Sequence, residues 1–458
     1  MRCSSKRRIR TPQLEASRRV PWGTVEAMNI AVVSLGKIGL PLAVQFASSG
    51  ATVVGLDTED YAVDAVNRGV EPYPGEHLLQ QKLSLVIETG QLRATTSYAE
   101  AIPNADVVVI AVPLLVEDST DEPDFQELDV LTTSVAEHLT PDTLISFETT
   151  LPVGTTRRRW KPLIETISGL SEGTDFHLVH SAERLFIGRI FEDLRRYPKL
   201  MGAFSAEGAR RARQFYEAVL QFDDRPDLDR PNGVWDLGSP EASEMAKLAE
   251  TTYRDVNIGL ANQFGVYAAA HGIDVHDVIE ACNSQPFSHI HRPGISVGGL
   301  CIPNHPRLYL STDPEANIVR TARTFNATMP ERLVNRAADL LGALHGMKVV
   351  VLGASYRGGV KETTFSGVFP TVAALLERGA EVFVHDPFFS DEELRSMGFM
   401  PYVCGATVDL AVVHTDHDEY RTLAPQQLPG VKLLVDGRAI TDSTLWSGIP
   451  RVVIGMPA

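Results

Sequence analysis

The segment GGLCIPNHP, from Gly298 to Pro306, contains two side chains that can do chemistry. Cys301 is a candidate nucleophile, because a thiolate attacks electron-poor carbon. His305 follows four residues later, and an imidazole that titrates near neutrality can act as a base. Each residue also has a plainer interpretation. Single cysteines are commonly buried and inert, and His305 can equally be a loop histidine with no catalytic part.

A second pair of polar side chains lies on a long helix that we predict over residues 239–271. Ser239 suits the N-cap of this helix, and Gly272 follows as a stop signal. Lys247 and Thr251 are four residues apart, so they share one helix face. A helical lysine is usually a solvated charge, and Lys247 alone indicates little. A helix of this length is typical of a spine between domains, and we expect it to form a homodimer surface.

The strongest local signal is a dinucleotide-binding pattern near the start of the chain. Residues 29–57 predict a strand, a turn, a helix and a second strand. The turn contains Ser34, Gly36 and Gly39, where bare backbone lets a pyrophosphate reach the helix N-terminus. Serine replaces the first glycine of the usual pattern, at some conformational cost. Asp57 ends the second strand, where a carboxylate receives ribose hydroxyls and favours NAD over NADP.

The same alternation continues along the chain and predicts an α/β fold. Further strands are expected at 105–113, 143–152 and 176–184, the last of which we expect to end the first sheet. A second α/β unit without the glycine pattern follows, with strands or strand-containing segments at 347–359, 368–387, 410–415 and 432–438. The predicted architecture is two Rossmann-like doubly wound domains, joined by a long central helix and a helical dimerisation region.

These segments define four regions of the 458-residue chain. We expect a disordered or non-native extension at 1–27, an NAD-binding domain at 28–205, a central helical domain with the lysine and cysteine at 206–328, and a substrate-binding Rossmann-like domain at 329–458. The extension is basic, and its SRRV motif resembles a twin-arginine signal, but no apolar segment follows it.

Composition excludes several classes of protein. The net charge of −16 argues against general nucleic-acid binding. The longest apolar run, at 107–116, is too short to cross a membrane. The four cysteines form no close pair, so neither a disulfide framework nor a metal site is predicted, and a reducing cytoplasm fits best. The acidic stretch at 116–124 is expected to be a solvated loop.

Taken together, the motifs of this sequence resemble those of the UDP-sugar dehydrogenase family, which includes the UDP-glucose and UDP-N-acetylhexosamine 6-dehydrogenases. The resemblance runs from Met28 nearly to the C-terminus. It rests on SLGKIGLPLA (34–43), TTLPVGTT (149–156), SAERLFIG (181–188), KLAETTYRDVNIGLANQF (247–264), VGGLCIPNHP (297–306), HDP (385–387) and DGR (436–438). The segments TYRDVNIGLAN and CIP are most similar to the N-acetylhexosamine branch.

The resemblance implies that a sugar C6 alcohol is oxidised to a carboxylate with two NAD. Cys301 is then the nucleophile that forms a thiohemiacetal and a thioester. Lys247 stabilises the developing oxyanion, Thr150 helps to hold a catalytic water, and Glu183 acts in thioester hydrolysis. The remaining assignments are Ile38, Pro113 and Thr150 for the cofactor, and Arg357, Arg438, Arg292 and Gly298 for the substrate.

Several positions depart from the family pattern, and they lie at the expected site. His305 replaces an aspartate, Thr251 replaces an asparagine, and Thr364 replaces an arginine, while VPLL (112–115) replaces VPTP. His305 can retain the role of a base but does not supply a negative charge beside Lys247. Three interpretations therefore stay open: full oxidation to the uronate, a variant that stops at the aldehyde or uses an unusual nucleotide in specialised metabolism, and a non-catalytic ligand-binding relative.

Overall fold

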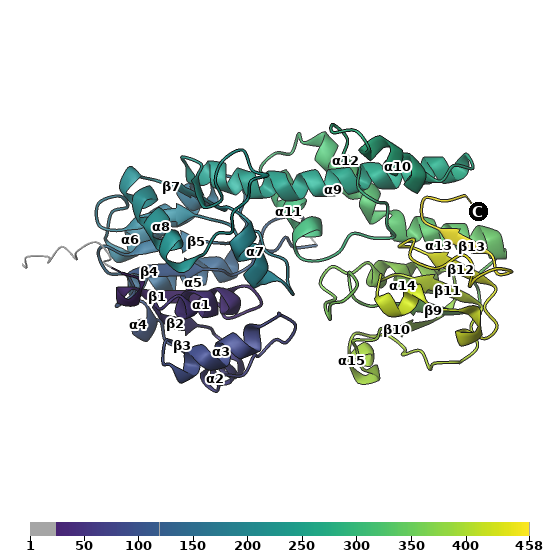
Figure 1. The fold of residues 1–458 in the computed structure, drawn as a ribbon, viewed down its shortest axis with the longest axis horizontal. Coiled ribbons are helices and arrows are strands. Elements are labelled where there is room, and N and C mark those ends of the chain that lie inside the picture. Colours follow the sequence, from purple (N-terminus) through teal and green to yellow (C-terminus); the bar gives the residue numbers. More distant parts are fainter. Residues whose placement is uncertain (1–23, 119, 458) are drawn as a thin grey trace, which may run out of the picture.

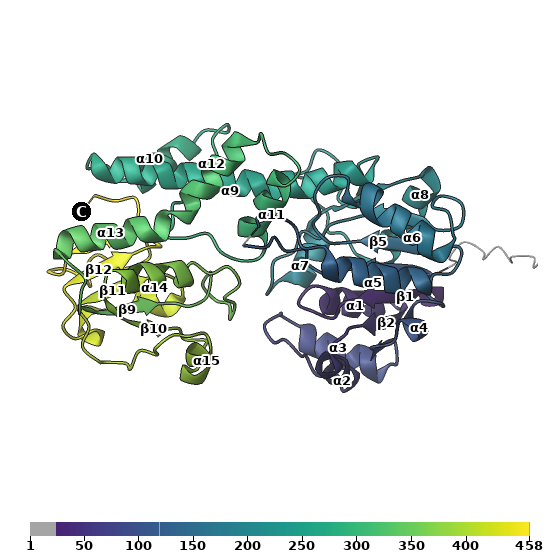
Figure 2. The same ribbon diagram turned by 180° about the vertical axis from the view of Figure 1, so that it is seen from behind.

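The structure, a computed structural model, describes residues 24–118 and 120–457. Two α/β lobes are bridged by one long helix, α9 (Pro240–Ala270), which lies along the top of both lobes in Figure 1 and is seen from behind in Figure 2. Residues 1–23, most of the predicted N-terminal extension, lie outside the described residues. The predicted fold class, with two Rossmann-like sheets and a long central helix, is confirmed.

The N-terminal lobe is built on an eight-stranded sheet with the order β3-β2-β1-β4-β5-β6-β7-β8. Its strands are β1 (Asn29–Val33), β2 (Thr52–Leu56), β3 (Leu92–Thr95), β4 (Val107–Ile110), β5 (Leu144–Phe147), β6 (His177–His180), β7 (Lys199–Ala203) and β8 (Val234–Asp236). Its helices are α1 (Gly39–Ser48), α2 (Asp60–Asn67), α3 (Leu79–Glu88), α4 (Tyr98–Ala101), α5 (Gln126–Glu137), α6 (Lys161–Ser168), α7 (Ile190–Arg196) and α8 (Ala206–Val219), with short turns η1 (Val25–Ala27) and η2 (Thr156–Trp160).

The expectation that residues 176–184 end this sheet is wrong. Strand β7 pairs antiparallel with β6, and β8 pairs parallel with β7. The segment KLMGA of β7 begins with a lysine, which usually indicates an exposed position. In the structure Lys199 is buried, and its charge is paired with Glu148 and Glu183. Gly202 permits this strand to lie directly under the start of α9, since a Cβ atom there would be 1.8 Å from the Ser239 carbonyl oxygen.

Alternating residues of the central strands fill a separate core on each face of the sheet. Ile30 and Val32 of β1 pack with α1, α3, α7 and α8 on one face. Ala31 and Val33 pack with α5 and α6 on the other face, which also receives Leu248 of α9 and Leu308 of α11 (Cys301–Leu310). This alternation follows from the two-residue period of a strand, and it docks both site-bearing helices on one face of the N-terminal sheet.

Helix α9 begins and ends where the sequence predicts. The Ser239 hydroxyl accepts a hydrogen bond of 3.2 Å from the Ala242 backbone N–H, and Pro240 occupies the first turn. Around it lie α10 (Val275–Asn283), α11, α12 (Asn317–Ala327) and α13 (Met329–Leu341). A buried network joins α9 to α12: Asp255 accepts hydrogen bonds of 2.8 Å from both Arg323 and Asn326. No helix among the described residues is long and apolar enough to cross a membrane.

The C-terminal lobe contains a parallel sheet with the order β10-β9-β11-β12-β13. Its elements are β9 (Lys348–Leu352), α14 (Val368–Glu377), β10 (Glu381–His385), α15 (Asp391–Ser396), β11 (Leu410–Val413), α16 (Asp418–Arg421), η3 (Pro425–Gln427), β12 (Leu433–Asp436) and β13 (Arg451–Val453). Side-chain contacts join the two lobes directly. Lys37 forms an ion pair with Glu362, and Arg357 donates a hydrogen bond of 2.8 Å to the Ile187 carbonyl oxygen.

Candidate active site

Cys301 is the first residue of α11, which lies below α9 between the two lobes in Figure 1. Its side chain is half-buried, and it is a free thiol. His305 follows one helical turn later, on the same face, and is 95% buried (5% exposed). The Nδ1 atom of His305 is enclosed and has no hydrogen-bond partner among the described residues. The structure therefore brings the two chemically capable residues of the segment together.

Lys247 lies close to this helix and is buried, with 6% of its surface exposed. Burial lowers the pKa of His305 well below its usual value, and the positive charge of Lys247 lowers it further. The same ammonium also helps to lower the pKa of Glu183. The charge of Lys247 therefore acts on both an imidazole from α11 and a carboxylate from the loop after β6. The imidazole of His305 is neutral in this setting.

Thr251 lies one turn after Lys247 and is buried. Its hydroxyl donates to the backbone carbonyl oxygens of Lys247 (3.0 Å) and Leu248 (3.2 Å). A hydroxyl has a single proton to donate. The Thr251 oxygen can therefore accept a hydrogen bond at this position, but its proton is already used within α9.

Glu183 and Thr150 reach the same region from neighbouring strands of the N-terminal sheet. Thr150 follows β5, and Glu183 follows β6. The two segments run side by side, since the Glu183 backbone N–H donates to the Glu148 carbonyl oxygen at 3.2 Å. The Glu183 side chain is 9% exposed and forms an ion pair with Lys199. Parallel strands thus deliver both residues to one edge of the sheet.

The glycines before Cys301 serve a close contact with the C-terminal lobe. A Cβ atom on Gly298 would be 2.7 Å from Tyr356 Cβ, and one on Gly299 would be 2.9 Å from the Tyr356 ring. Gly299 also has a φ of +84°, which other residues rarely adopt. Its N–H donates to the Thr364 carbonyl oxygen at 2.9 Å. The segment that carries the thiol therefore rests on the second lobe.

The predicted substrate arginines differ in their surroundings. Arg438 donates to the carbonyl oxygens of His414 (2.7 Å) and Ser296 (3.3 Å), so it links β11 to the segment before Cys301. Arg357 spans the two lobes through its bond to Ile187. Arg292 is exposed. The structure places Arg438 and Arg357 near the junction of the lobes and leaves Arg292 at the surface.

The turn after β1 fits a dinucleotide. Ser34 has a φ of +80°, so it carries the conformational cost expected where glycine is usual. A Cβ atom on Gly39 would be 2.0 Å from the Ser34 carbonyl oxygen, whereas one on Gly36 would meet only the Ser34 hydroxyl, at 3.5 Å. Asp57 accepts hydrogen bonds from the N–H groups of Leu35 (2.7 Å) and Glu59 (3.0 Å). It stays partly exposed, with lone pairs left for ribose hydroxyls. The predicted residues Ile38 and Pro113 are half-buried and exposed, respectively.

Comparison with known proteins decides the family. Models of the UDP-glucose/GDP-mannose dehydrogenase family match the chain in three parts: an NAD binding domain at residues 28–220, a central domain at 241–328 and a UDP binding domain at 350–443. The chain belongs to the UDP-glucose/GDP-mannose dehydrogenase family. It is an NAD-dependent UDP-sugar dehydrogenase, an oxidoreductase, and NAD is its cofactor.

Individual relatives in this family are similar over nearly the whole chain. A UDP-N-acetyl-D-mannosamine dehydrogenase of Pyrococcus horikoshii is 35% identical over 428 residues, which cover 90% of this chain and 96% of the relative. The structure of UDP-D-ManNAc dehydrogenase from that organism matches with a TM-score of 0.83 and 32% identity, covering 93% of this chain and 99% of that one. The UDP-N-acetyl-mannosamine dehydrogenase of Staphylococcus aureus matches with a TM-score of 0.79 and 28% identity, covering 93% and 98%.

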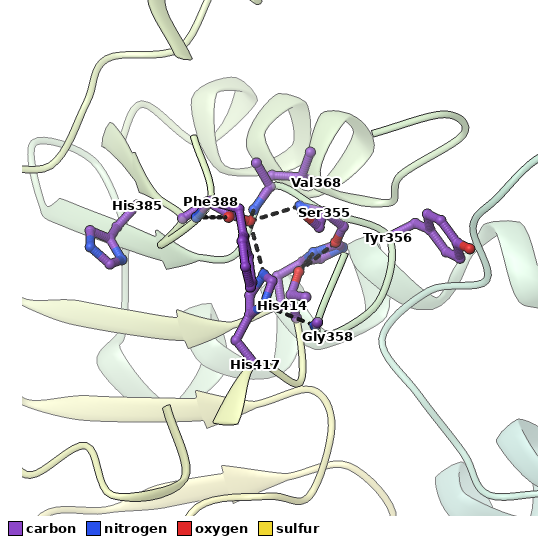
Figure 3. A network of polar contacts seen from close by, with 12 residues as sticks. Ser355, Tyr356, Gly358, Val368, His385, Phe388, His414 and His417 are labelled. Atoms are coloured by element: carbon purple, nitrogen blue, oxygen red, sulfur yellow. Dashed lines mark hydrogen bonds and ion pairs between the residues drawn. The ribbon is translucent and has the colours of Figure 1, made fainter. Parts of the chain in front are cut away.

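The UDP binding domain of this dehydrogenase differs from its NAD binding domain at the matching acidic residue. Asp386 follows β10 as Asp57 follows β2, but it is 3% exposed. It accepts hydrogen bonds from the backbone N–H groups of Ala354 (2.8 Å) and Ser355 (3.0 Å), and it contacts His417 Nε2 at 3.1 Å. Figure 3 shows His417 within this network and the Tyr356 ring pointing away from it. Asp386 is therefore not available for ribose hydroxyls.

Sequence reasoning missed four residues that support the dehydrogenase site. Lys199 and Glu148 hold Glu183, while Asn304 and Arg307 fix α11 to the loop after β4. The acidic loop is consequently not simply solvated, because Arg307 pairs with two of its carboxylates. One available signal was position: Glu148 directly precedes the TTLPVGTT motif, and Asn304 lies between Cys301 and His305.

Proposed function

We propose that this dehydrogenase oxidises the C6 alcohol of a UDP-N-acetylhexosamine to the uronate, with UDP-N-acetyl-D-mannosamine as the first substrate to test. The names of the relatives support this sugar. The observation that carries the proposal is the charge of the buried Lys247, which acts on both His305 and Glu183. His305 lies one helical turn from Cys301 on α11. A cation in a buried site favours an oxygen anion that forms during reaction.

The first oxidation uses His305 and Lys247. The neutral imidazole of His305 accepts the proton of the C6 hydroxyl, and the ammonium of Lys247 stabilises the oxygen as its negative charge develops. When bound, NAD supplies the hydride acceptor for both oxidations. Burial of His305 keeps the ring unprotonated, and so ready to accept a proton, throughout the physiological pH range.

The second oxidation uses Cys301. Its thiolate bonds to the aldehyde carbon, and Lys247 stabilises the resulting oxyanion of the thiohemiacetal. Loss of hydride leaves a thioester on Cys301. Water then bonds to the acyl carbon, one water proton passes to Glu183, and the C–S bond breaks with its electron pair on sulfur. Thr150, which follows β5 as Glu183 follows the neighbouring strand β6, holds that water.

The deciding experiment counts NADH formed per sugar consumed over a panel of UDP-hexoses and UDP-N-acetylhexosamines. Full oxidation gives two NADH per sugar. Cys301→Ser should then release the aldehyde after one NADH, while Cys282→Ser, a matched change of another free cysteine, should still give two. Two NADH per sugar from Cys301→Ser would contradict the thioester route.

A second candidate is a dehydrogenase that stops at the aldehyde, and Thr251 favours it. Because the Thr251 hydroxyl donates within α9, the site has one hydrogen-bond donor fewer for the second oxyanion. This candidate predicts one NADH per sugar in the wild type, and an aldehyde that hydrazine reagents trap.

We also propose a homodimer formed through the outer face of α9. Tyr253, Leu260, Phe264 and Tyr267 recur at helical spacing and are 61%, 43%, 40% and 63% exposed. An apolar stripe of this kind marks an interface more often than a solvated surface. Sedimentation velocity should show a dimer, and Leu260→Asp with Tyr267→Asp should give a monomer. A wild type that sediments only as a monomer would refute the proposal.

A further inference from the structure

A buried cluster of charged groups lies directly behind Glu183. Lys199 of β7 donates a hydrogen bond of 3.0 Å to Glu148 and also pairs with Glu183. The three side chains are almost closed to solvent, with exposed fractions of 5% for Lys199, 0% for Glu148 and 9% for Glu183. One ammonium group is therefore shared by two carboxyl groups, of which only Glu183 reaches the site.

The far side of Glu148 is closed by a tyrosine from α8. The Tyr216 hydroxyl donates a hydrogen bond of 2.6 Å to Glu148 Oε1, and Ser146 lies 2.7 Å from the same hydroxyl. Glu148 Oε1 thus binds Tyr216, and Oε2 binds Lys199. The Glu148 side chain is 0% exposed, so a proton that it holds is shielded from water.

The charges in the cluster do not balance unless one proton is added. Two ionised carboxyl groups and one ammonium leave an excess negative charge, which is costly where water is excluded. The other titratable groups that face the cluster do not cancel it. Tyr216 is uncharged, and burial lowers the pKa of His180 to about 4, so that ring is neutral as well. The charge of Lys247, on α9, also acts on Glu183.

The surroundings of the two carboxyl groups decide which of them holds the proton. Burial raises the pKa of Glu148 to about 8, although the charge of Lys199 acts in the opposite direction. Burial would also raise the pKa of Glu183, but the charge of Lys199 and hydrogen bonds from Glu148 and Lys199 outweigh it and lower that pKa. The charge of Lys247 lowers the pKa of Glu183 further.

We propose that Glu148 is a positioning residue that keeps a proton at neutral pH and, through Lys199, presents Glu183 to the sugar as an anionic base. The proposal rests on the function proposed above, in which Glu183 takes a proton from water during thioester hydrolysis. With Glu148 protonated, the cluster is neutral before that step and Glu183 is its only anion. Ionisation of Glu148 at higher pH adds a second negative charge behind Glu183. This charge raises the proton affinity of Glu183.

The test measures the Glu148 proton itself by difference infrared spectroscopy of the full-length protein with pH. The wild type should show the C=O stretch of a protonated carboxyl group, which disappears as the pH rises through about 8. Glu148→Gln should lack this band, and Glu183→Gln should lose it at lower pH than the wild type, because the second carboxylate helps to raise the pKa of Glu148. Persistence of the band in Glu148→Gln, or its absence from the wild type at neutral pH, would overturn the proposal.

A second variant reports on the same ionisation without changing a charge. Tyr216→Phe removes a hydrogen bond that stabilises ionised Glu148, so the band should persist to higher pH, and the step in the pH profile of kcat should shift the same way. Tyr402→Phe, which removes a tyrosine bond to a backbone carbonyl in the other lobe, is the matched control and should leave both unchanged. Equal profiles for wild type and Tyr216→Phe would count against Glu148.

The infrared measurement does not depend on turnover, so the two proposals can fail separately. A band that is lost in Glu148→Gln, in a protein that oxidises none of the sugars, overturns the proposed function. Sugar oxidation with a band that Glu148→Gln leaves unaltered overturns the role of Glu148 alone.

Discussion

The Asn304 side chain donates a hydrogen bond of 2.8 Å to the carbonyl oxygen of Leu114, which lies 190 residues earlier in the chain. The same amide accepts a hydrogen bond of 3.0 Å from the Val116 backbone N–H. Asn304 is fully buried and stands between Cys301 and His305 on α11. One side chain therefore sets the loop after β4, at the cofactor edge of the sheet, against the helix that carries the thiol.

Replacing Asn304 with alanine should destabilise the protein and misplace the thiol. The change leaves the Leu114 carbonyl and the Val116 N–H buried without partners, at a cost of about 2 kcal/mol or more in the free energy of unfolding. Urea unfolding measures this cost, and the rate of Cys301 alkylation reports the position of the thiol. Asn317→Ala, at an exposed asparagine, should change the unfolding free energy by less than about 0.5 kcal/mol. Equal effects of the two variants would contradict this role.

The acidic loop should contribute little stability through its ion pairs. Arg307 pairs with Asp118 at 2.8 Å and with Asp121 at 2.7 Å, but those carboxylate side chains are 86% and 75% exposed. Exposed pairs are worth up to about 1 kcal/mol and are screened by salt. Asp118→Asn and Asp121→Asn should therefore lower the unfolding free energy by less than about 1 kcal/mol, and high salt should erase the difference. A larger, salt-insensitive loss would show that the loop is held in another way.

Two glycines of the NAD turn should respond differently to alanine. Gly36→Ala places a methyl group in open space beside the Ser34 hydroxyl, so the free energy of unfolding should change by less than about 1 kcal/mol. NAD affinity should nevertheless fall at least about tenfold, equivalent to about 1.4 kcal/mol, because the pyrophosphate needs that space. Gly39→Ala meets a backbone oxygen at 2.0 Å and should destabilise the protein even without NAD. Calorimetric titration with NAD and thermal unfolding measure the two effects, and unchanged NAD affinity in Gly36→Ala would contradict the assignment of this turn.

The stability of the protein should depend on pH through Glu148. Its pKa is raised from 4.5 to about 8, chiefly by burial, so between these pH values the folded state holds a proton that the unfolded state has released. The free energy of unfolding contributed by this group therefore decreases as the pH rises across that window. Glu148→Gln removes the dependence, so its stability relative to wild type should increase from pH 4.5 to pH 8. Denaturant titrations at several pH values measure this, and parallel curves for the two proteins would be inconsistent with a buried proton.

The pKa of His305 should rise when the charge of Lys247 is removed. Burial first, and then Lys247, keep its pKa well below the usual value. Lys247→Met removes the nearby positive charge and should raise the pKa of His305, while burial keeps it below that of an exposed histidine. NMR of labelled histidine, with His305→Gln to assign the signal, follows the change. If His305 is the base of the first oxidation, His305→Gln should also lower kcat roughly 100-fold. A signal that titrates normally in the wild type would disagree with the buried setting.

The parts of the fold with strong local patterns could be predicted from sequence. Strands β1, β4, β9 and β11 are short apolar runs buried on both faces. The Ser239 hydroxyl caps the start of α9, and Gly272, with a φ of +70°, follows its end. Strand β7 could not be found in this way, because Lys199 faces the interior and is neutralised only by residues distant in sequence. Burial of a charge depends on tertiary pairing, which a local pattern does not contain.

The candidate site likewise has one part that local sequence spacing predicts and another part that required the structure. Lys247 and Thr251 are one turn apart on a helix that the sequence predicts, so their shared face follows from spacing. The sequence does not predict helix α11, because Pro303 and Pro306 disfavour a helix, so the shared face of Cys301 and His305 required the structure. That Lys247 acts on both His305 and Glu183 required the structure, since these residues come from three separate elements. The inward turn of the Thr251 hydroxyl is also a matter of rotamer rather than of sequence.

The burial of Asp386 in the C-terminal lobe has a consequence for how that lobe selects between NAD and the sugar nucleotide. The chain uses one nucleotide-binding scaffold twice, and two equivalent copies would compete for the more abundant nucleotide. His417 and three backbone N–H groups bind Asp386, whereas Asp57 stays partly exposed. A cofactor molecule that enters the second lobe lacks this carboxylate as an acceptor for its ribose, so we expect excess NAD to compete weakly with the sugar nucleotide. We expect the duplicated scaffold to limit inhibition by its own cofactor in this way.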